Sequence, residues 1–464
     1  MTVVPGLILC LLLPAADKPP ALPATWDPVA IDQYIAGQVK SKNLIGVSVA
    51  LVRNGQVELA KGYGSTALKD GVPVTADTPF AIGSVSKQFT CAAILLLAQD
   101  GKLSIDDPVA KYFPKLTKAD KIRIQDLMGH TSGYPDYYPL DFLDRRMKNA
   151  IALDDLIHQY AGGKLDFEPG EKYSYSNTGF IILGRIVEKV SGVSLGEFLE
   201  QRVFKPLGMT NTKLDPDPKT PGLSTGHTAH LLGDGEAAIP EGKGWLHGAG
   251  GIYSTANDLA KWDIGLLSGK VVNDANLKQL ETPRKLNDGK RRYYSYGLSI
   301  TERDGETILA HGGAVSGFHS YNAMIRRNKS AVILLANAEH IDSAGMHRDI
   351  LNLMIKDPNA IPKVSGLAAV DEAKALIAQL QKGELSRDRL AEEFSHYMSE
   401  ERVAKAKEIL GGLGAPVRVD LEGMSERGGM EVAAFRITFK GRVVKASLYR
   451  KPDGTIEQFL LSNP

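Results

Sequence analysis

Ser84-Val85-Ser86-Lys87 opens the stretch around which we expect this chain to fold, and Gln-Phe-Thr-Cys-Ala-Ala-Ile-Leu-Leu-Leu follows it over residues 88–97. The apolar run contains no Gly or Pro before Gly101, which predicts a buried helix that stops there. Residues three apart are neighbours on a helix surface. We therefore expect Ser84 in the first turn and Lys87 one turn later, with both side chains facing the same way.

This pair of side chains suggests nucleophilic catalysis. Burial disfavours the charged form of a lysine and lowers its pKa toward the range in which the amine can act as a base. A serine hydroxyl needs such a base to become a nucleophile. Ser-x-x-Lys is a common pattern, so it indicates a catalytic site only if other segments of the chain supply the remaining groups.

Length and composition describe a globular protein. At 464 residues the chain exceeds one average domain of about 100–200 residues. A content of 43% hydrophobic and 23% charged residues is ordinary, and the net charge of +1 gives no electrostatic reason to expect a nucleic-acid partner. The two cysteines, Cys10 and Cys91, exclude a disulfide framework, and Cys91 is most simply a core residue.

The N-terminus resembles a secretory signal. Residues 6–13 are apolar apart from Gly6, and Pro14-Ala15-Ala16 follow them, as in the apolar centre and small-residue end of such a segment. The run is too short to span a bilayer. The usual Lys or Arg before it is missing. We expect residues 1–17 to be a signal peptide, the protein to be exported to the periplasm or the cell exterior, and no stable membrane span.

Two further segments could complete a site. Tyr175 and Asn177 stand two residues apart just before an apolar helix, and residues at that spacing in an extended segment point the same way. Later, His311-Gly312-Gly313-Ala314 follows a strand, where a Gly pair would let a substrate backbone approach closely. A Tyr-rich turn and a simple bulge are the structural alternatives.

Other motifs favour structural roles. His130 has no second His or Cys at ligand spacing, so we expect it to bond a loop. The Gly-rich stretch 247–251 lacks the Lys-Ser/Thr ending of a phosphate-binding loop and is better explained by close backbone packing. Ser254 or Thr255 is expected to cap the next helix. Alternating apolar residues around Asn54-Gly55 predict a hairpin.

Residues 366–464 differ in character and predict a separate α+β domain. We expect helices at 369–383, 386–394 and 399–411, followed by strands near 416–422, 430–439, 442–450 and 456–461. No catalytic set is apparent in this part. A role in dimerisation or in covering the mouth of a site is the preferred interpretation.

Taken together, Ser84-x-x-Lys87, Tyr175-x-Asn177 and His311-Gly312-Gly313 resemble the three motifs of the serine β-lactamase and penicillin-binding protein family. The Tyr-x-Asn form resembles the branch that holds class C β-lactamases, D-alanyl-D-alanine carboxypeptidases, D-aminopeptidases and related esterases. Residues 129–133 and 248–255 are also similar to that branch. The resemblance covers roughly residues 28–355.

This resemblance implies a fold and a domain organisation. The expected class is α+β, β-lactamase/transpeptidase-like, with an antiparallel sheet flanked by helices and a helical subdomain. A serine hydrolase domain would occupy residues 26–360, and the small C-terminal α+β domain would follow at 366–464. The sequence predicts no particular oligomeric state.

The resemblance also implies roles. Ser84 would attack a carbonyl and become acylated, while Lys87 and Tyr175 would share the proton transfers, with the main base left open. Asn177 would hold Lys87 and a substrate amide. The backbone N–H groups of Ser84 and Ala314, beside Gly313, would form the oxyanion hole. No metal or organic cofactor is expected.

One departure from the family pattern shifts the expected activity. His311 stands where the best-known β-lactamases have Lys, and Gly312 stands in place of Thr. Histidine is mostly neutral at pH 7, so we expect weaker selection for β-lactams or other free carboxylates. The prediction is an esterase, amidase or peptidase acting on a small-molecule or peptide acyl substrate. The alternative is a non-hydrolytic binder or sensor of cell-wall peptides or penicillin.

Overall fold

The computed structural model describes residues 21–23, 25–138, 145–229, 233–356 and 361–463. The chain divides into two compact units, Pro28–Asn352 and Leu353–Pro464, the latter together with Pro23–Asp27. Each unit is described by itself. The predicted signal peptide, residues 1–17, lies outside the described residues.

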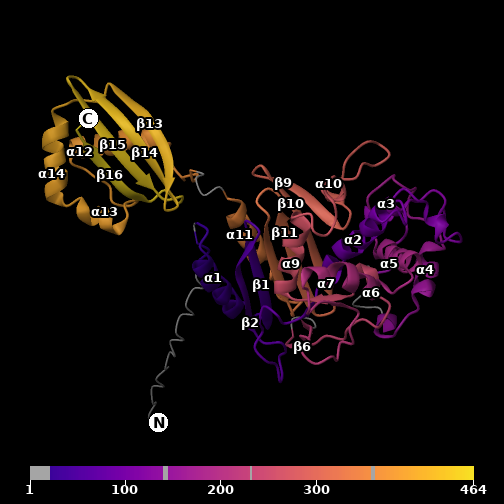
Figure 1. The fold of residues 1–464 in the computed structure, drawn as a ribbon. Coiled ribbons are helices and arrows are strands. Elements are labelled where there is room, and N and C mark those ends of the chain that lie inside the picture. Colours follow the sequence, from indigo (N-terminus) through magenta and orange to yellow (C-terminus); the bar gives the residue numbers. More distant parts are fainter. Residues whose placement is uncertain (1–20, 24, 139–144, 230–232, 357–360, 464) are drawn as a thin grey trace, which may run out of the picture. The chain divides into compact units, whose positions relative to one another are not determined.

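The first unit is built on a seven-stranded antiparallel sheet of order β2-β1-β12-β11-β10-β9-β8 (Figure 1). Its strands are β1 (Gly46–Arg53), β2 (Gln56–Gly64), β8 (Tyr294–Ser295), β9 (Leu298–Arg303), β10 (Glu306–Val315), β11 (Phe318–Ile325) and β12 (Ser330–Ala336). The hairpin predicted at Asn54-Gly55 is confirmed, and both residues have the positive φ that its tight turn requires. Because β1 pairs with β12, the two ends of the unit meet inside the sheet.

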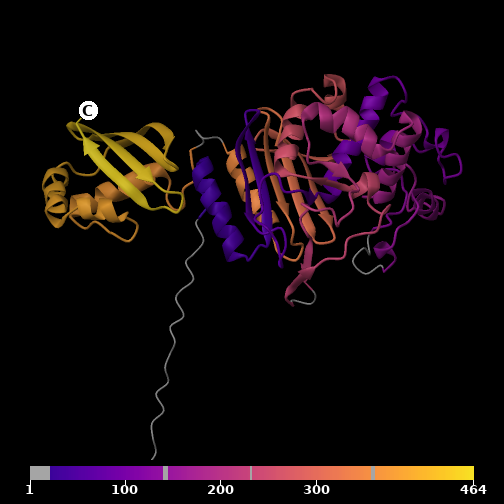
Figure 2. The same ribbon diagram turned by 60° about the horizontal axis from the view of Figure 1, so that its bottom comes forward.

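Helices cover both faces of this sheet (Figure 2). On one face lie α1 (Pro28–Ser41) and α11 (Ala344–Ile355), joined by a 2.8 Å hydrogen bond from Tyr34 Oη to Asp349 Oδ2. The helices on the other side are α2 (Ser86–Gln99), α3 (Ile124–Met128), α4 (Leu153–Ala161), α5 (Asn177–Ser191), α6 (Leu195–Leu199), α7 (Lys205–Leu207), α8 (His247–Gly250), α9 (Ala256–Leu267) and α10 (Asp274–Leu280). The predicted antiparallel sheet with flanking helices and a helical subdomain is confirmed.

Helix α2 lies at the centre of the core. Its residues from Ser86 to Leu97 are all buried, so the apolar run of the sequence is explained by packing on every side. Short strands connect the helical part to the main sheet: β3 (Phe80–Ala81), β4 (Lys213–Leu214) and β7 (Ile252–Ser254) form one small sheet, and β5 (His227–Ala229) and β6 (Gly235–Ala237) form another. Thr255 caps α9 by accepting the N–H of Asp258 at 3.0 Å.

Asp263 of α9 is a carboxyl group without exposure to solvent. Its Oδ1 accepts a 2.9 Å hydrogen bond from Asn322 Nδ2, and its Oδ2 has no partner among the described residues. Burial raises the pKa of Asp263 to about 8, against the bond from Asn322. The folded protein therefore holds this group as a neutral acid at pH 7.

We expect Asp263→Asn to flatten the pH dependence of stability. Since the pKa of Asp263 is raised in the folded state, the group contributes to the free energy of unfolding. This contribution is fully present below the unfolded pKa of about 4 and is lost as pH rises through 8. Between about pH 5 and pH 8, the unfolding free energy of both proteins is compared as pH rises. That of the wild type should fall by about 1 kcal/mol per pH unit more than that of the variant. Urea unfolding at several pH values measures this slope. Asp120→Asn on the surface controls for net charge, and equal slopes in all three proteins would contradict the expectation.

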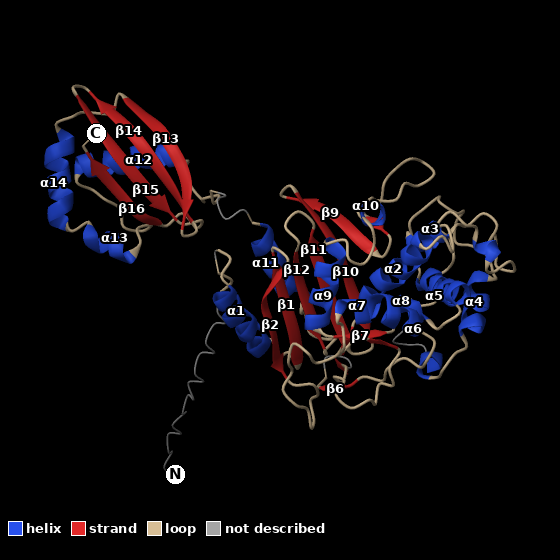
Figure 3. Cartoon of the chain, in the orientation of Figure 1, coloured by secondary structure: helices blue, strands red, loops and turns tan. Residues whose placement is uncertain are grey.

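The second unit is a four-stranded antiparallel sheet of order β13-β14-β15-β16 with helices packed against one face (Figure 3). Its elements are α12 (Ala369–Lys382), α13 (Glu392–Tyr397), α14 (Glu400–Gly411), β13 (Arg418–Arg427), β14 (Met430–Phe439), β15 (Arg442–Arg450) and β16 (Ile456–Ser462). Alternate residues of β14, among them Phe435 and Ile437, are buried in the core beneath the helices. Three helices followed by four strands match the predicted order.

The predicted helix at 386–394 is wrong in position. The helix begins only at Glu392 because the preceding segment pairs with the start of β16. Ala391 N–H donates to the Ile456 carbonyl at 2.9 Å, and Ile456 N–H donates to the Arg389 carbonyl at 2.7 Å. This tertiary pairing overrides the local helix propensity of the segment.

Among the described residues, no helix is both long and apolar enough to cross a bilayer.

Candidate active site

Ser84 lies in a short 3-10 turn, Gly83–Val85, and α2 begins only at Ser86. The predicted continuous helix from Ser84 is therefore wrong by two residues. Gly83 has φ +48° and lies so close to β10 that a Cβ there would be 2.9 Å from Ala314 N. The Ile82 carbonyl accepts a 2.7 Å hydrogen bond from Ser320 Oγ. The turn that carries the hydroxyl is thus fixed against the sheet.

The amine of Lys87 lies directly below this hydroxyl. Lys87 is fully buried, and its Nζ is 3.0 Å from Ser84 Oγ. Nζ also donates to Asn177 Oδ1 of α5 and to the Ala249 carbonyl of α8, each at 2.7 Å. Burial lowers the pKa of Lys87 to about 7, against the attraction of the Asp136 carboxylate.

Three acceptors surround Nζ, which is the number that the three N–H donors of an ammonium group require. Because the pKa of Lys87 is lowered to about 7, the neutral amine is also present at neutral pH. In that form the Asn177 and Ala249 carbonyls can keep the two remaining hydrogens while the lone pair faces Ser84 Oγ. The position of Nζ is thus compatible with acceptance of the serine proton.

Tyr175 approaches the hydroxyl from the loop before α5. Its Oη donates to Ser84 Oγ at 2.8 Å. Burial raises the pKa of Tyr175 above its ordinary range, with the bond to Ser84 opposing. Its ring centroid lies 4.3 Å from that of His130, with the two ring planes tilted by 33°. Since the raised pKa keeps the phenol protonated at neutral pH, it favours Lys87 over Tyr175 as the base, a choice that the sequence left open.

Asp136 joins this set and was missed by sequence reasoning. The Asn177 N–H donates to its Oδ1 at 2.9 Å, and Asn177 Nδ2 lies 3.2 Å from each carboxylate oxygen. Asp136 thus orients the amide that holds Lys87. A lone carboxylate three residues after Gly133 matched no motif, so its position behind the 129–133 turn was the only available signal.

The third motif brings the sheet to the nucleophile. Strand β10 pairs with β9 only as far as Ala310, while its pairing with β11 continues to Val315. The part of β10 after Ala310, which does not pair with β9, contacts the Ser84 turn. A Cβ on Gly313 would lie 2.1 Å from the Ile82 carbonyl oxygen. Only glycine permits this approach, and it places Ala314 beside the turn. The motif, expected at the end of a strand, lies inside β10.

His311 is held as a neutral ring. Its Nδ1 lies 2.6 Å from the Gly312 carbonyl oxygen, which assigns the proton to Nδ1. Its Nε2 then accepts from Tyr294 Oη at 3.0 Å. Burial, together with the nearby Lys87 amine, lowers the pKa of His311 to about 3. His311 consequently supplies no positive charge at neutral pH.

The structural role predicted for His130 is confirmed. Its Nδ1 accepts the N–H of Ser176 at 3.1 Å, and its carbonyl accepts that of Ser174. Burial lowers the pKa of its imidazole well below the ordinary value. His130 therefore fixes the loop that presents Tyr175. The close packing predicted for 247–251 is also observed, since a Cβ on Gly248 would lie 2.7 Å from the Phe180 carbonyl oxygen.

A cavity of about 530 Å³ opens above these groups. Every predicted site residue except Lys87 lines it, and Lys87 lies beneath. The lining residues are Ser84, Asp136, Tyr137, Tyr138, Tyr175, Asn177, Leu246, Ala249, Gly250, His311, Gly312, Gly313, Ala314, Val315, His319 and Tyr321. Within this described lining, Asp136 is the only carboxylate and no Lys or Arg occurs. The described part of the chain holds no cluster of three or more His, Cys, Asp or Glu suited to a metal ion.

Comparisons with known proteins find relatives for the first unit. A family model described as Beta-lactamase matches residues 31–353. The D-aminopeptidase of Brucella anthropi is 28% identical over 318 residues, which cover 68% of this chain and 60% of that protein. The match therefore spans well under the full length of this curated relative.

Two solved structures share the fold. The octameric penicillin-binding protein homologue from Pyrococcus abyssi superposes with a TM-score of 0.63 at 21% identity, over 94% of this chain and all of that one. The D-amino acid amidase from Ochrobactrum anthropi, complexed with L-phenylalanine amide, gives 0.60 at 22% identity, over 70% of this chain and 96% of that one.

Proposed function

Since this chain belongs to the β-lactamase family of serine hydrolases, we propose that it hydrolyses amides of D-amino acids, or short peptides that begin with one, through an acyl-Ser84 intermediate. The observation that carries the proposal is the fully buried amine of Lys87, which lies 3.0 Å from Ser84 Oγ and is held by two carbonyls at 2.7 Å. The preference for the D configuration is supported by the names of the D-aminopeptidase and D-amino acid amidase relatives.

The charges of the cavity favour a substrate with a free amino group. His311 is neutral, and no Lys or Arg is found among the described lining residues, so a substrate carboxylate has no cation to pair with. Asp136 offers a carboxylate instead, and charge-assisted hydrogen bonds between carboxylate and ammonium are strong. An α-ammonium group near Asp136 would place the adjacent carbonyl toward Ser84.

Acylation would begin with transfer of the Ser84 hydroxyl proton to Lys87 Nζ as Oγ attacks the carbonyl carbon. The resulting oxyanion would be stabilised by the N–H groups of Ser84 and Ala314, which the approach of β10 brings together. The phenol of Tyr175, beside Oγ, is placed to relay the proton from Lys87 to the leaving nitrogen. The C–N bond then breaks and the acyl group stays on Ser84.

Deacylation would use the same groups. Lys87 is neutral again once the leaving amine has taken its proton, so it can remove a proton from a water that attacks the ester carbonyl. Collapse of the second tetrahedral intermediate returns the proton to Ser84 Oγ and releases the acid. Covalent labelling without turnover would instead favour the alternative of a penicillin or cell-wall peptide sensor. Export through residues 1–17 likewise stays a proposal from the sequence.

A panel of chromogenic substrates tests the proposal. It comprises the p-nitroanilides of D-phenylalanine, L-phenylalanine and N-acetyl-D-phenylalanine, together with p-nitrophenyl acetate and a chromogenic cephalosporin. We expect the highest kcat/KM among the anilides for the free D-amino acid derivative. Equal turnover of the D and L compounds, or faster opening of the cephalosporin than of any anilide, would reject the proposed substrate class.

We expect Asp136→Asn to raise KM for the free D-phenylalanine anilide more than for its N-acetyl analogue. The amide keeps an oxygen for the N–H of Asn177 but loses the charge that would pair with the substrate ammonium. A bond to a charged group is worth about 1.5–3 kcal/mol, so kcat/KM for the free amine should fall roughly tenfold to a hundredfold. Steady-state kinetics on both anilides measure the difference. An equal loss on both would assign Asp136 to positioning alone.

A further inference from the structure

The two carbonyls that hold Lys87 come from different helices. Asn177 begins α5, and Ala249 lies in the short helix α8. Each is 2.7 Å from Nζ. The position of Nζ relative to Ser84 Oγ therefore depends on how α8 sits against α5. Thr90 Oγ1 of α2 holds α8 from the other side by donating to the Gly248 carbonyl at 2.7 Å.

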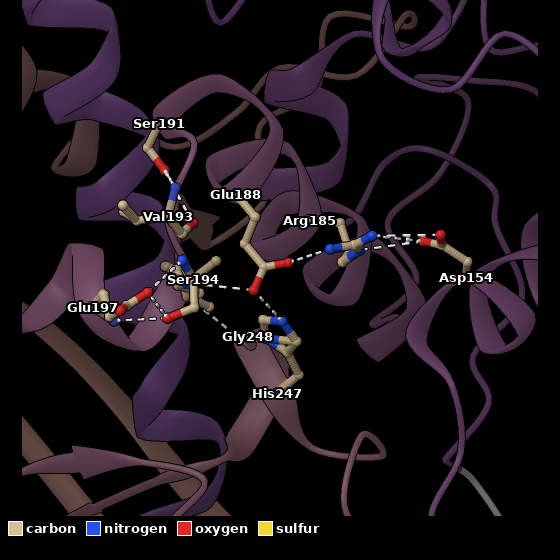
Figure 4. Close-up of polar contacts among 11 residues, drawn as sticks. Asp154, Arg185, Glu188, Ser191, Val193, Ser194, Glu197, His247 and Gly248 are labelled. Carbon is tan, nitrogen blue, oxygen red and sulfur yellow. Dashed lines mark hydrogen bonds and ion pairs between the residues drawn. The ribbon is translucent and has the colours of Figure 1, made fainter.

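The side chain of His247 joins α8 to α5 by reaching Glu188 (Figure 4). Its ring is buried and lies over Gly184, where an added Cβ would be 3.1 Å from Cε1 of the ring. One turn further along α5, Glu188 Oε1 lies 3.2 Å from His247 Nε2. The same carboxylate is fixed by the Leu195 N–H at 3.1 Å and by Arg185 Nη1 at 2.5 Å.

The backbone at His247 is strained. Its φ of +31° lies in a region that costs a non-glycine residue about 1–3 kcal/mol and is kept only where the surroundings impose it. Burial lowers the pKa of His247 to about 4, against the attraction of Glu188. The ring is thus neutral at pH 7, with its proton on Nε2 facing Glu188. The other nitrogen, Nδ1, is buried with no hydrogen-bond partner among the described residues.

We propose that His247, held by Glu188, is a positioning residue for the catalytic amine: it locks α8 to α5 and thereby sets the Ala249 and Asn177 carbonyls around Lys87. This inference rests on the proposed role of Lys87 as the base. It adds a pair of residues that touch neither the substrate nor the reacting atoms.

Two substitutions of His247 separate positioning from backbone strain. In His247→Gln, the side-chain amide nitrogen can occupy the place of Nε2 and donate to Glu188, whereas the shorter His247→Asn cannot reach. Asn, however, tolerates positive φ better than Gln. If His247 positions the amine, the His247→Gln protein should react faster at Ser84 than the His247→Asn protein. If only backbone strain matters, the His247→Asn protein should react faster.

The readout is the rate at which a fluorophosphonate labels Ser84, followed from about pH 5 to pH 9. This probe needs no natural substrate, so failure of the proposed D-amino acid activity and failure of the positioning role are distinguishable. We expect His247→Asn to label roughly tenfold to a hundredfold more slowly. Its pH midpoint should move upward, because a loosened α8 admits water to Lys87 and burial is the main cause of its low pKa. His247→Gln should keep the wild-type midpoint.

Both Lys87 and His247 have charged and titratable neighbours that could also move a pH midpoint. Those around Lys87 are Tyr175, Asp136, Cys91, His130 and His311, and those around His247 are Glu188, Arg185 and, at the end of α8, Asp215. The control is Glu197→Ala, which removes the capping box of α6 in the same region without touching α8. It should lower the melting temperature and leave the pH midpoint unchanged.

Glu188→Ala keeps the test decisive if His247→Asn does not fold, because it leaves the backbone of α8 unaltered. It should reproduce the slower labelling and the higher midpoint. The proposal is overturned if both His247 variants label at the wild-type rate and midpoint. It is equally overturned if His247→Asn or Glu188→Ala loses only thermal stability while the midpoint stays fixed.

Discussion

Ser84→Ala will remove covalent labelling by a fluorophosphonate and lower hydrolysis by roughly 10⁴- to 10⁶-fold, the range expected when the nucleophile of an acyl-transfer enzyme is lost. The hydroxyl receives the hydrogen bond of Tyr175 and faces the amine of Lys87. No other hydroxyl in the described part of the chain is shown with both contacts. Peptide mass spectrometry of the labelled protein locates the adduct, and the melting temperature shows that the variant is folded.

The same motif provides the matched control. Ser86 stands two residues on, is fully buried, and accepts the Ile252 N–H at 3.1 Å. Ser86→Ala leaves that N–H without a partner, at a cost of about 1–3 kcal/mol in stability, but should still be labelled at Ser84. Labelling of the Ser84→Ala protein at Ser86, or hydrolysis by it near the wild-type rate, would refute the assignment of the nucleophile.

The sequence sufficed for the parts of this molecule that local rules govern. The hairpin at Asn54-Gly55 follows from turn chemistry, and the buried helix after Ser84 follows from an apolar run with no Gly or Pro. The motifs around Tyr175 and His311 were found because each is a short pattern in the chain. The structure brings Ser84, Tyr175, Asn177, His311, Gly313 and Ala314 to one cavity.

The features of the fold and the site that the sequence did not predict depend on contacts between distant segments. The Ala249 carbonyl bonds Lys87 across 162 positions, and a backbone group has no sequence signature. Asp136 acts through Asn177, 41 positions away, and Glu188 meets His247 only because α8 folds onto α5. The error at 386–394 has the same origin, since pairing with Ile456 keeps the segment before Glu392 out of the helix.

Lys87→Arg is expected to lower the rate of acylation by about 10² to 10⁴-fold, the contribution of a general base. Burial brings the pKa of Lys87 to about 7, so its neutral form increases as pH rises through that value. Acylation by the wild type should therefore rise with pH, with a midpoint near 7, and then level off. A guanidinium cannot be deprotonated in this range, so the variant keeps the positive charge but loses the base.

Comparison with Lys87→Met and Tyr175→Phe assigns the midpoint to one group. Lys87→Met removes both charge and base and should show no midpoint near 7. Tyr175→Phe removes the bond to Ser84 Oγ but keeps Lys87 and its two carbonyl partners, so its slower acylation should titrate at nearly the wild-type pH. If Lys87→Met retained the midpoint while Tyr175→Phe lost it, the proton acceptor would be Tyr175. If Tyr175 were the acceptor with its pKa lowered by a protonated Lys87, the midpoint would instead move to higher pH in Lys87→Met.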